Sequence, residues 1–331
     1  MPMVQLGQGS GMKRIISVSR RTDVPAFYGD WFMRRIDEGF AGVVAPYGGK
    51  RYLVSLRPEE VACFVFWSKD FTAFVPHLET LDRLGYRFYF NYTLTALPAV
   101  FEIHVDKAAA FKTLRYLSER YSPRHINWRF DPIILSSITD GEFYLEAFER
   151  LAGPLAGRVE RCYFSFVTPY EKVKRNLLPL TASGIRLLGP HRDEKIALAD
   201  RLAAVADRRG IRMYSCCDDA LLSPWIHKAH CIDGGIVEQL FFPQGFEHKA
   251  KPTRDECSCT ESIDLGTYDT CPHGCLYCYA NAHKAIAGAA FRRHDPDSAF
   301  LGYGKSQSDP WIAEIRQDDS DRKATSPTLF P

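Results

Sequence analysis

Residues 264–281 read DLGTYDTCPHGCLYCYAN and place three cysteines in the spacing C-x-x-x-C-x-x-C. These are Cys271, Cys275 and Cys278, and Gly274 between them allows a sharp turn. A cubane [4Fe–4S] cluster takes four thiolates, so a loop that supplies three leaves one iron open to another ligand. Zinc is the less favoured alternative here, because zinc sites prefer paired C-x-x-C units and closed tetrahedral sets.

The cysteine loop lies between a strand expected at 262–267 and a helix expected from Tyr279 to about Phe291. Upstream, short runs rich in β-branched and aromatic residues alternate with helical stretches, and most runs are apolar throughout, as in strands buried on both faces. Strands are expected at 14–19, 42–45, 62–67, 87–92, 125–129, 161–166 and 211–215, and helices at 106–120, 143–151 and 193–209.

This alternation predicts an α/β fold with a parallel sheet and helical crossovers. The expected architecture is a (β/α) barrel, complete or irregular, and an open doubly wound sheet is the runner-up. We expect a flexible N-terminal tail at 1–12, a single barrel-like domain at 13–301 that includes the cysteine-rich region 216–278, and a polar tail at 302–331 that is loosely ordered or draped on the surface.

Composition excludes several classes of protein. The 331 residues are 46% hydrophobic and 25% charged, so the chain is not disordered overall. Lysine plus arginine number 42 against 40 acids, which excludes a strongly basic nucleic-acid coat but not a local basic groove. No run approaches the ~18 apolar residues of a membrane span. The start, MPMVQLGQGSGMKR, lacks the apolar segment of a secretory signal, so a cytoplasmic location is expected.

The ten cysteines favour metal or redox chemistry over disulfides in a chain without a secretory signal. Cys63 and Cys162 stand alone in apolar runs, where we expect them to be core residues. Outside the cysteine loop, four of five further cysteines are expected to hold a second [4Fe–4S] cluster; a structural zinc site, or no metal, is the alternative. The five are Cys216, Cys217, Cys231, Cys257 and Cys259.

The cysteine loop, with Tyr277 directly before its last cysteine, resembles the motif of radical S-adenosylmethionine (SAM) enzymes, and its Tyr-Cys-Tyr-Ala ending resembles the spore photoproduct lyase branch. The resemblance implies that the three cysteines hold a [4Fe–4S] cluster whose fourth iron is chelated by SAM. It implies that the reduced cluster cleaves SAM to a 5′-deoxyadenosyl radical, that Tyr277 frames the adenine, and that flavodoxin or ferredoxin donates the electron. The Gly-Gly-Glu motif for SAM is absent, so other residues must recognise SAM.

Residues 13–302 also resemble a largely uncharacterised bacterial family described as radical-SAM-like or as DNA repair photolyases. This resemblance implies that Cys216, Cys231, Cys257 and Cys259 form the second set of ligands. Radical SAM barrels place the cluster loop after the first strand, so here the strand–loop–helix unit is expected to be permuted to the C-terminus. The resemblance rests on the closing cysteine stretch and on SRRTDVP at 19–25, FWSKD at 66–70 and WRFDP at 128–132.

Charged side chains follow several apolar runs, where a barrel would present them at its mouth. An arginine fork suits carboxylates and phosphates, so these residues are candidates to bind the SAM carboxylate or an anionic substrate. Structural ion pairs, Arg129–Asp131 or Arg20–Asp23, are the alternative. Tryptophans in the same runs would stack on adenine or a nucleobase, with core packing as the alternative. The cofactor-binding candidates are Tyr277, Arg20, Arg21, Asp23, Trp67, Lys69, Trp128, Arg129 and Asp131.

We therefore expect a radical SAM enzyme that uses [4Fe–4S] and SAM. The lyase-like resemblance suggests a nucleic-acid lesion or modified base as substrate, which must be extruded into the barrel mouth. A small metabolite or a peptide is an equally compatible substrate. The alternatives are a non-catalytic iron–sulfur electron-transfer protein and a zinc-stabilised nucleic-acid-binding protein. We expect His273 to be a loop residue rather than a fourth ligand, because a protein ligand on the open iron would block SAM.

Overall fold

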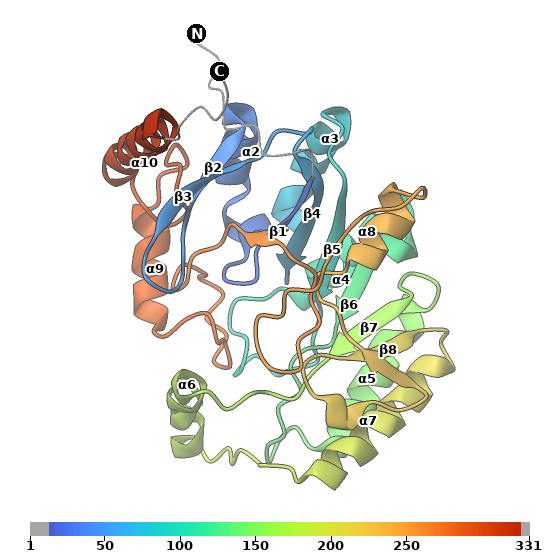
Figure 1. The fold of residues 1–331 in the computed structure, drawn as a ribbon. Helices are drawn as coiled ribbons and strands as arrows, with labels where there is room; N and C mark the ends of the chain where they lie inside the picture. The colour runs from blue at the N-terminus through green and yellow to red at the C-terminus, as the bar shows by residue number, and fades with distance from the viewer. Residues whose placement is uncertain (1–12, 326–331) are drawn as a thin grey trace.

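The computed structural model describes residues 13–325, and an eight-stranded parallel sheet forms its centre (Figure 1). Along the sheet the strands follow the order β10-β1-β4-β5-β6-β7-β8-β9. From β1 to β9 the order advances in one direction, and β10 returns to pair with β1. The strands are β1 Arg14–Val18, β4 Val61–Ser68, β5 Phe88–Thr93, β6 Ile126–Arg129, β7 Arg161–Phe164, β8 Arg212–Ser215, β9 Ile226–Lys228 and β10 Ile263–Asp264.

The predicted α/β class with a parallel sheet is confirmed. In residues 13–325 no pairing joins the edge strands β9 and β10, so a closed barrel is not confirmed. Figure 1 shows α5 and α7 side by side along β6 to β8, and α9 and α10 beside the β2–β3 hairpin. The helices are α1 Val24–Phe27, α2 Gly29–Glu38, α3 Val75–Arg83, α4 Lys107–Arg120, α5 Gly141–Leu155, α6 Glu171–Ala182, α7 Arg192–Asp207, α8 Gly234–Phe241, α9 Lys284–Arg293 and α10 Lys305–Thr325.

Local signals account for most of these elements. The Asp106 carboxylate accepts hydrogen bonds from the first turn of α4, and Gly210, with a φ of 69°, follows the last turn of α7. The run at 42–45 is a strand, but it lies outside the main sheet: β2 (Phe40–Val44) pairs antiparallel with β3 (Arg51–Ser55). Neither β3 nor β9 was predicted from the sequence. β9 is the last strand in the order of the main sheet.

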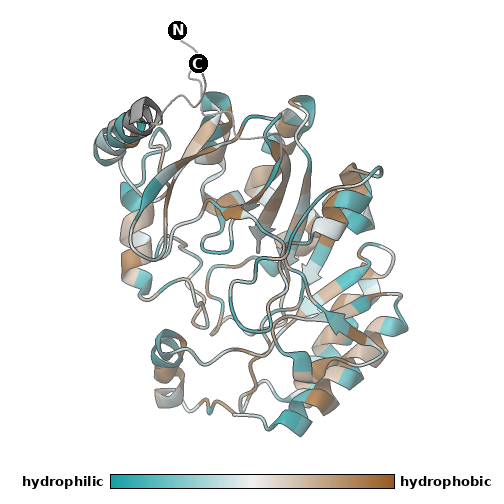
Figure 2. Ribbon diagram, viewed as in Figure 1, coloured by the Kyte–Doolittle hydropathy of each residue, from teal (hydrophilic) through white to brown (hydrophobic). Residues whose placement is uncertain are grey.

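Side chains of the strands alternate between two cores, one on each face of the sheet. The outer core lies between the sheet and helices such as α4, α5 and α7, and includes Phe64, Phe90 and Trp128. The inner core holds Val65 and Tyr89 from the strands, and α8 packs there as well. Figure 2 shows hydrophobic residues along the strands of the sheet. The inner face therefore carries both apolar packing and the functional candidates.

The C-terminal segment differs from its prediction. Residues 305–325 form α10 instead of a loosely ordered tail, because Trp311 gives this polar stretch an apolar anchor. Its indole packs against Phe300 and Tyr303, and the Arg51 guanidinium lies over its ring at 4.4 Å. The predicted tail at 1–12 lies outside the described residues. No helix within 13–325 is both long and apolar enough to cross a membrane.

Candidate functional site

The cysteine loop (residues 271–278) follows β10 at the carboxyl end of the sheet. Gly274 has a φ of 73°, the left-handed conformation that the sharp turn requires. Burial raises the pKa of the Cys275 thiol to about 12 and also raises the pKa of Cys271. The charges of Cys278 and Cys275 add to the raised pKa of Cys271, and no disulfide joins the three cysteines in the described structure.

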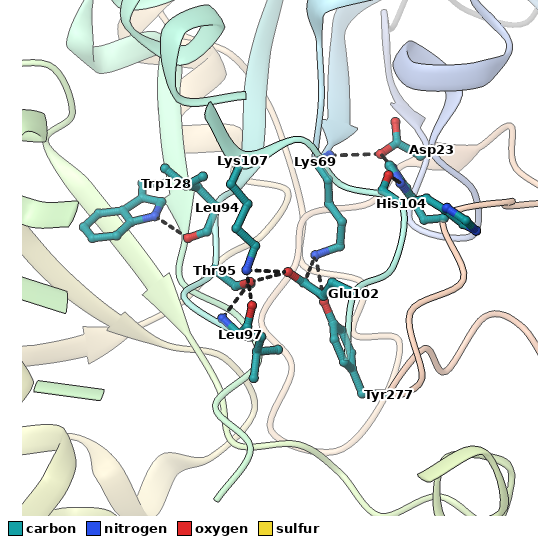
Figure 3. Close-up of polar contacts among 11 residues, drawn as sticks. Asp23, Lys69, Leu94, Thr95, Leu97, Glu102, His104, Lys107, Trp128 and Tyr277 are labelled. Carbon is teal, nitrogen blue, oxygen red and sulfur yellow. Dashed lines mark hydrogen bonds and ion pairs between the residues drawn. The ribbon is translucent and has the colours of Figure 1, made fainter. Parts of the chain in front are cut away.

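A buried polar network fixes this loop against the loop that follows β5 (Figure 3). The Lys69 ammonium donates to a Glu102 carboxylate oxygen at 2.6 Å and to the Tyr277 hydroxyl at 2.7 Å, and Tyr277 itself donates to Glu102. Thr95 and Lys107 bind the other carboxylate oxygen at 2.6 and 3.3 Å. Burial by itself would raise the pKa of Glu102, but the two lysines outweigh it and lower the pKa to about 2. Glu102 thus holds four side chains together as a buried carboxylate.

Asp23 connects the cysteine loop to β1 and β4. One of its oxygens caps α1 at Ala26, and the other accepts from the Lys69 backbone N–H at 2.9 Å and lies 2.8 Å from His273 Nε2. His273 Nδ1 lies 3.2 Å from the His104 carbonyl oxygen, so both ring nitrogens are engaged. The prediction that His273 is a loop residue is confirmed. The predicted pair Arg20–Asp23 is wrong, because Asp23 has these other partners.

Arg20 pairs instead with Asp264 at the end of β10. The buried Asp264 carboxylate accepts from the hydroxyls of Ser17 and Ser19, each at 2.7 Å, and lies within 3.5 Å of Arg20 and 3.7 Å of Arg21. Burial raises the pKa of Asp264, but the two guanidiniums outweigh it and lower the pKa. Asp264 therefore fastens β10 to β1 and orients both arginines at the edge of the sheet.

Arg129 and Trp67 meet on the inner face at the ends of β6 and β4. The Arg129 guanidinium lies over the Trp67 ring at 5.1 Å and donates to Asp131, so the predicted pair Arg129–Asp131 is confirmed. The same guanidinium donates to Cys231 Sγ at 3.1 Å, which connects it to the second cysteine set. Trp67 Nε1 is a buried donor without a partner within the described residues.

Trp128 lies on the opposite face from Arg129, as strand alternation requires. Its ring stacks on Phe148 with centroids 5.1 Å apart, and its Nε1 donates to the Leu94 carbonyl at 2.9 Å. Tyr92 also belongs to this outer core, where its hydroxyl donates to the Ala110 carbonyl. We correct the cofactor-binding assignment of Trp128 accordingly: it is a fully buried core residue. Of the two tryptophans, Trp67 alone reaches the inner face.

The second cysteine set gathers on the inner face below these residues. Cys216 Sγ lies 3.3 Å from Cys231 Sγ and 3.8 Å from Cys217 Sγ. Cys257 and Cys259 complete the group from the segment before β10, where the Cys259 N–H points to Cys257 Sγ at 3.5 Å. The lone cysteines of β4 and β7 are fully buried, as predicted.

Neither cysteine set has the arrangement of a formed metal site. Within the described residues, no group of three or more histidine, cysteine, aspartate or glutamate side chains surrounds a common point. Any assignment of a metal to either set therefore rests on the chemistry of the thiol donors and on the spacing of the cysteines.

Comparison with known proteins identifies a family. No curated protein matches the chain. Residues 15–280, from β1 through the cysteine loop, match the family described as a domain of unknown function (DUF1848). The match covers most of the chain and includes both cysteine sets, so this protein belongs to the DUF1848 family.

Proposed function

We propose that the protein is a radical SAM enzyme in which Cys271, Cys275 and Cys278 hold a [4Fe–4S] cluster. The observation that carries the proposal is a three-cysteine loop fixed at the carboxyl end of a parallel sheet, where α/β folds place their chemistry. When bound, the cluster supplies the electron that cleaves SAM. The chain's own part is to hold the loop, orient SAM and exclude water.

The donors of the loop fit this cluster. The three thiols lie on one loop of eight residues with a sharp turn at Gly274, and they would leave the fourth iron of a cubane without a cysteine ligand. His273 does not supply that ligand, because both its ring nitrogens have partners. Asn281 donates to the Cys271 carbonyl at 2.6 Å, and its Oδ1 is a buried acceptor without a partner in the described structure. This acceptor suits an ammonium such as that of SAM.

Side chains at the ends of β1 and β4 supply donors. Trp67 Nε1 and the guanidiniums of Arg20 and Arg21 suit a carboxylate, and the Trp67 ring offers a stacking surface backed by Arg129. Lys69 and Asp23 act as positioning residues, because their polar atoms hold the loop. The Tyr277 hydroxyl is occupied by Glu102 and Lys69, which leaves its ring to frame the adenine.

We further propose that β10, the cysteine loop and α9 are the first strand–loop–helix unit of a partial (β/α) barrel, permuted to the C-terminus. The parallel pairing of β10 with β1, ahead of β1 in the order of the sheet, supports this view. The electron donor would be a flavodoxin or a ferredoxin.

A nucleic-acid lesion or modified base is the proposed substrate. Tyr268, just before the loop and 37% exposed, lies between two cations: the Arg21 guanidinium at 5.5 Å and the Lys172 ammonium at 5.2 Å from its ring. An exposed aromatic ring flanked by cations suits a stacked base and its phosphates.

SAM cleavage tests the function. Anaerobically reconstituted protein is reduced with dithionite in the presence of SAM, and 5′-deoxyadenosine is measured. The wild type and Cys162→Ala, which alters a cysteine of the outer core, should form it, and Cys275→Ala should not. Product from Cys275→Ala would refute the assignment of the cluster. Iron-loaded wild type that never cleaves SAM would support electron transfer, and a chain that takes up only zinc would support the nucleic-acid binder.

A further inference from the structure

Five cysteines gather on the inner face of the sheet, and we refer to their thiols as the five-thiol site. Cys216 Sγ lies 3.3 Å from Cys231 Sγ, and the backbone bond from the Thr260 N–H to the Ile232 carbonyl, 2.9 Å long, brings Cys259 beside Cys231. The five cysteines come from three separate segments: one follows β8, one precedes α8 and one precedes β10. The fold therefore brings together cysteines far apart in sequence: Cys216, Cys217, Cys231, Cys257 and Cys259.

The spacing of these thiols suits ligands that share one metal ion. With zinc–sulfur bonds of about 2.3 Å, two thiolates of a tetrahedral site lie about 3.8 Å apart. Cys216 Sγ lies 3.3 Å from Cys231 Sγ, close to that separation, whereas the thiol 3.8 Å from it, Cys217, is only half-buried. Closing these thiols on one ion takes rotation about their Cα–Cβ bonds, because no three of them surround a common point in the described structure.

The backbone is turned unusually at this site. In the described chain, the non-glycine residues with positive φ are Cys217 at 57°, Glu256 at 57° and Asp269 at 55°. Two of these three lie in the five-thiol site, one of them directly before Cys257. The left-handed conformation is costly for such residues and persists where the surrounding structure requires it. Here it turns two chain segments so that the thiols meet.

Two arginines supply the charge that such a site requires. Four thiolates around a divalent ion carry a net charge of −2, which is costly to bury unless it is balanced. The Arg129 guanidinium lies 3.1 Å from Cys231 Sγ, and that of Arg254 lies 3.8 Å from Cys216 Sγ. Thr253 Oγ1 and the Cys259 N–H approach Cys257 Sγ at 3.6 and 3.5 Å. Such hydrogen bonds to sulfur orient metal-binding thiolates.

We propose that the five-thiol site binds one divalent metal ion of the zinc class through the four buried thiols. The ligands are Cys216, Cys231, Cys257 and Cys259, and the half-buried Cys217 is a neighbouring thiol that does not ligate. This single ion replaces the second [4Fe–4S] cluster that the sequence led us to expect. The inference does not depend on the radical SAM proposal, because it uses none of the cysteines of the loop.

Metal analysis of a full-length chain that carries Cys271→Ser, Cys275→Ser and Cys278→Ser isolates the site. After purification with zinc, we expect one zinc per chain and no acid-labile sulfide. Replacement by Co²⁺ should give the absorption of a tetrahedral thiolate complex. Adding Cys231→Ser or Cys259→Ser should weaken binding at least tenfold, whereas Cys217→Ser and Cys162→Ala should retain the metal. These two retained variants separate loss of a ligand from loss of folding.

Three results would overturn the proposal. About four irons and four sulfides per chain after reconstitution of the triple variant would show a second cluster. A metal-free chain whose thiol count is two short would show a disulfide, with Cys216 and Cys231 the closest pair. Loss of the metal in Cys217→Ser would show that the ligand set is wrong. None of these results bears on SAM cleavage, so the two proposals fail independently.

Discussion

The two cysteine regions differ in how the chain builds them. The cysteine loop is a single segment of eight residues, which distant polar side chains hold in place. The five-thiol site is assembled from three segments, and two of its thiols lie within 3.8 Å of Cys216 Sγ. A contiguous loop suits a cofactor that must remain open to a small molecule. A site closed by several segments suits an ion that stabilises the inner core.

The largest expected effect comes from removing the carboxylate that fixes the cysteine loop. Glu102→Ala leaves Lys69 and Lys107 without their buried partner, and breaking a buried pair costs about 3–5 kcal/mol. Denaturant unfolding of the metal-free protein measures this loss. The matched control is Glu142→Ala, whose exposed pair with Arg201 is screened by solvent and should contribute far less to stability. Equal losses in the two variants would show that the network does not stabilise the loop.

Glu102 should also make stability depend on pH. Its pKa is lowered from 4.5 to about 2, so its contribution is complete above pH 4.5 and is lost as the pH falls toward 2. The difference corresponds to about 3 kcal/mol. Unfolding midpoints between pH 5 and pH 3 should therefore fall more steeply for the wild type than for Glu102→Gln. Parallel profiles would mean that Glu102 titrates normally in the folded protein.

Arg129 tests whether the two regions are chemically separate. Because its guanidinium donates to Cys231, Arg129→Gln should weaken metal binding at the five-thiol site by about 10–100-fold. Competition with a chelator measures that affinity. The iron content of the reconstituted cysteine loop should not change, since Arg129 contacts none of its cysteines in the described structure. A parallel loss of iron would show that the two regions form one site.

The smallest effect distinguishes the two tryptophans. Trp67→Phe removes the unpartnered inner-face donor and should weaken SAM binding about fivefold, the equivalent of one hydrogen bond of about 1 kcal/mol. Trp128→Phe alters the outer core and should leave SAM affinity unchanged while lowering stability by about 1 kcal/mol. Equilibrium dialysis with SAM measures both affinities. If Trp128→Phe weakened SAM binding and Trp67→Phe did not, the SAM pocket would lie on the outer face of the sheet instead.

Most of the sheet could be predicted from the sequence because its buried strands are apolar over several consecutive residues. Short β9 has no such run, and β2 is apolar like the others, so its place in a separate hairpin is not visible in its composition. Neighbouring residues of a strand point to opposite faces of the sheet. Because Arg129 was expected to face inward, Trp128 could have been predicted to face outward. α10 was missed because one tryptophan provides its apolar contact.

The candidate site, too, has parts that could be predicted from the sequence and parts that could not. The cysteine loop is visible as a motif because its residues are adjacent in sequence. Glu102 is not, because it is a single acid in a loop and its partners lie far along the chain. Asp264 was likewise invisible as the partner of Arg20, and the sequence suggested the nearer Asp23 instead. Sequence proximity favours local pairs, whereas a parallel sheet brings together the ends of strands from distant segments.

Low-temperature EPR of the reduced, anaerobically reconstituted wild type, recorded with and without SAM, tests the central claim most directly. The account predicts about four irons per chain in one [4Fe–4S] cluster, whose signal changes when SAM is added. The signal should be absent from Cys275→Ala and unaltered in Cys217→Ser. A cluster signal that is indifferent to SAM, or a reconstituted protein without iron, would contradict it.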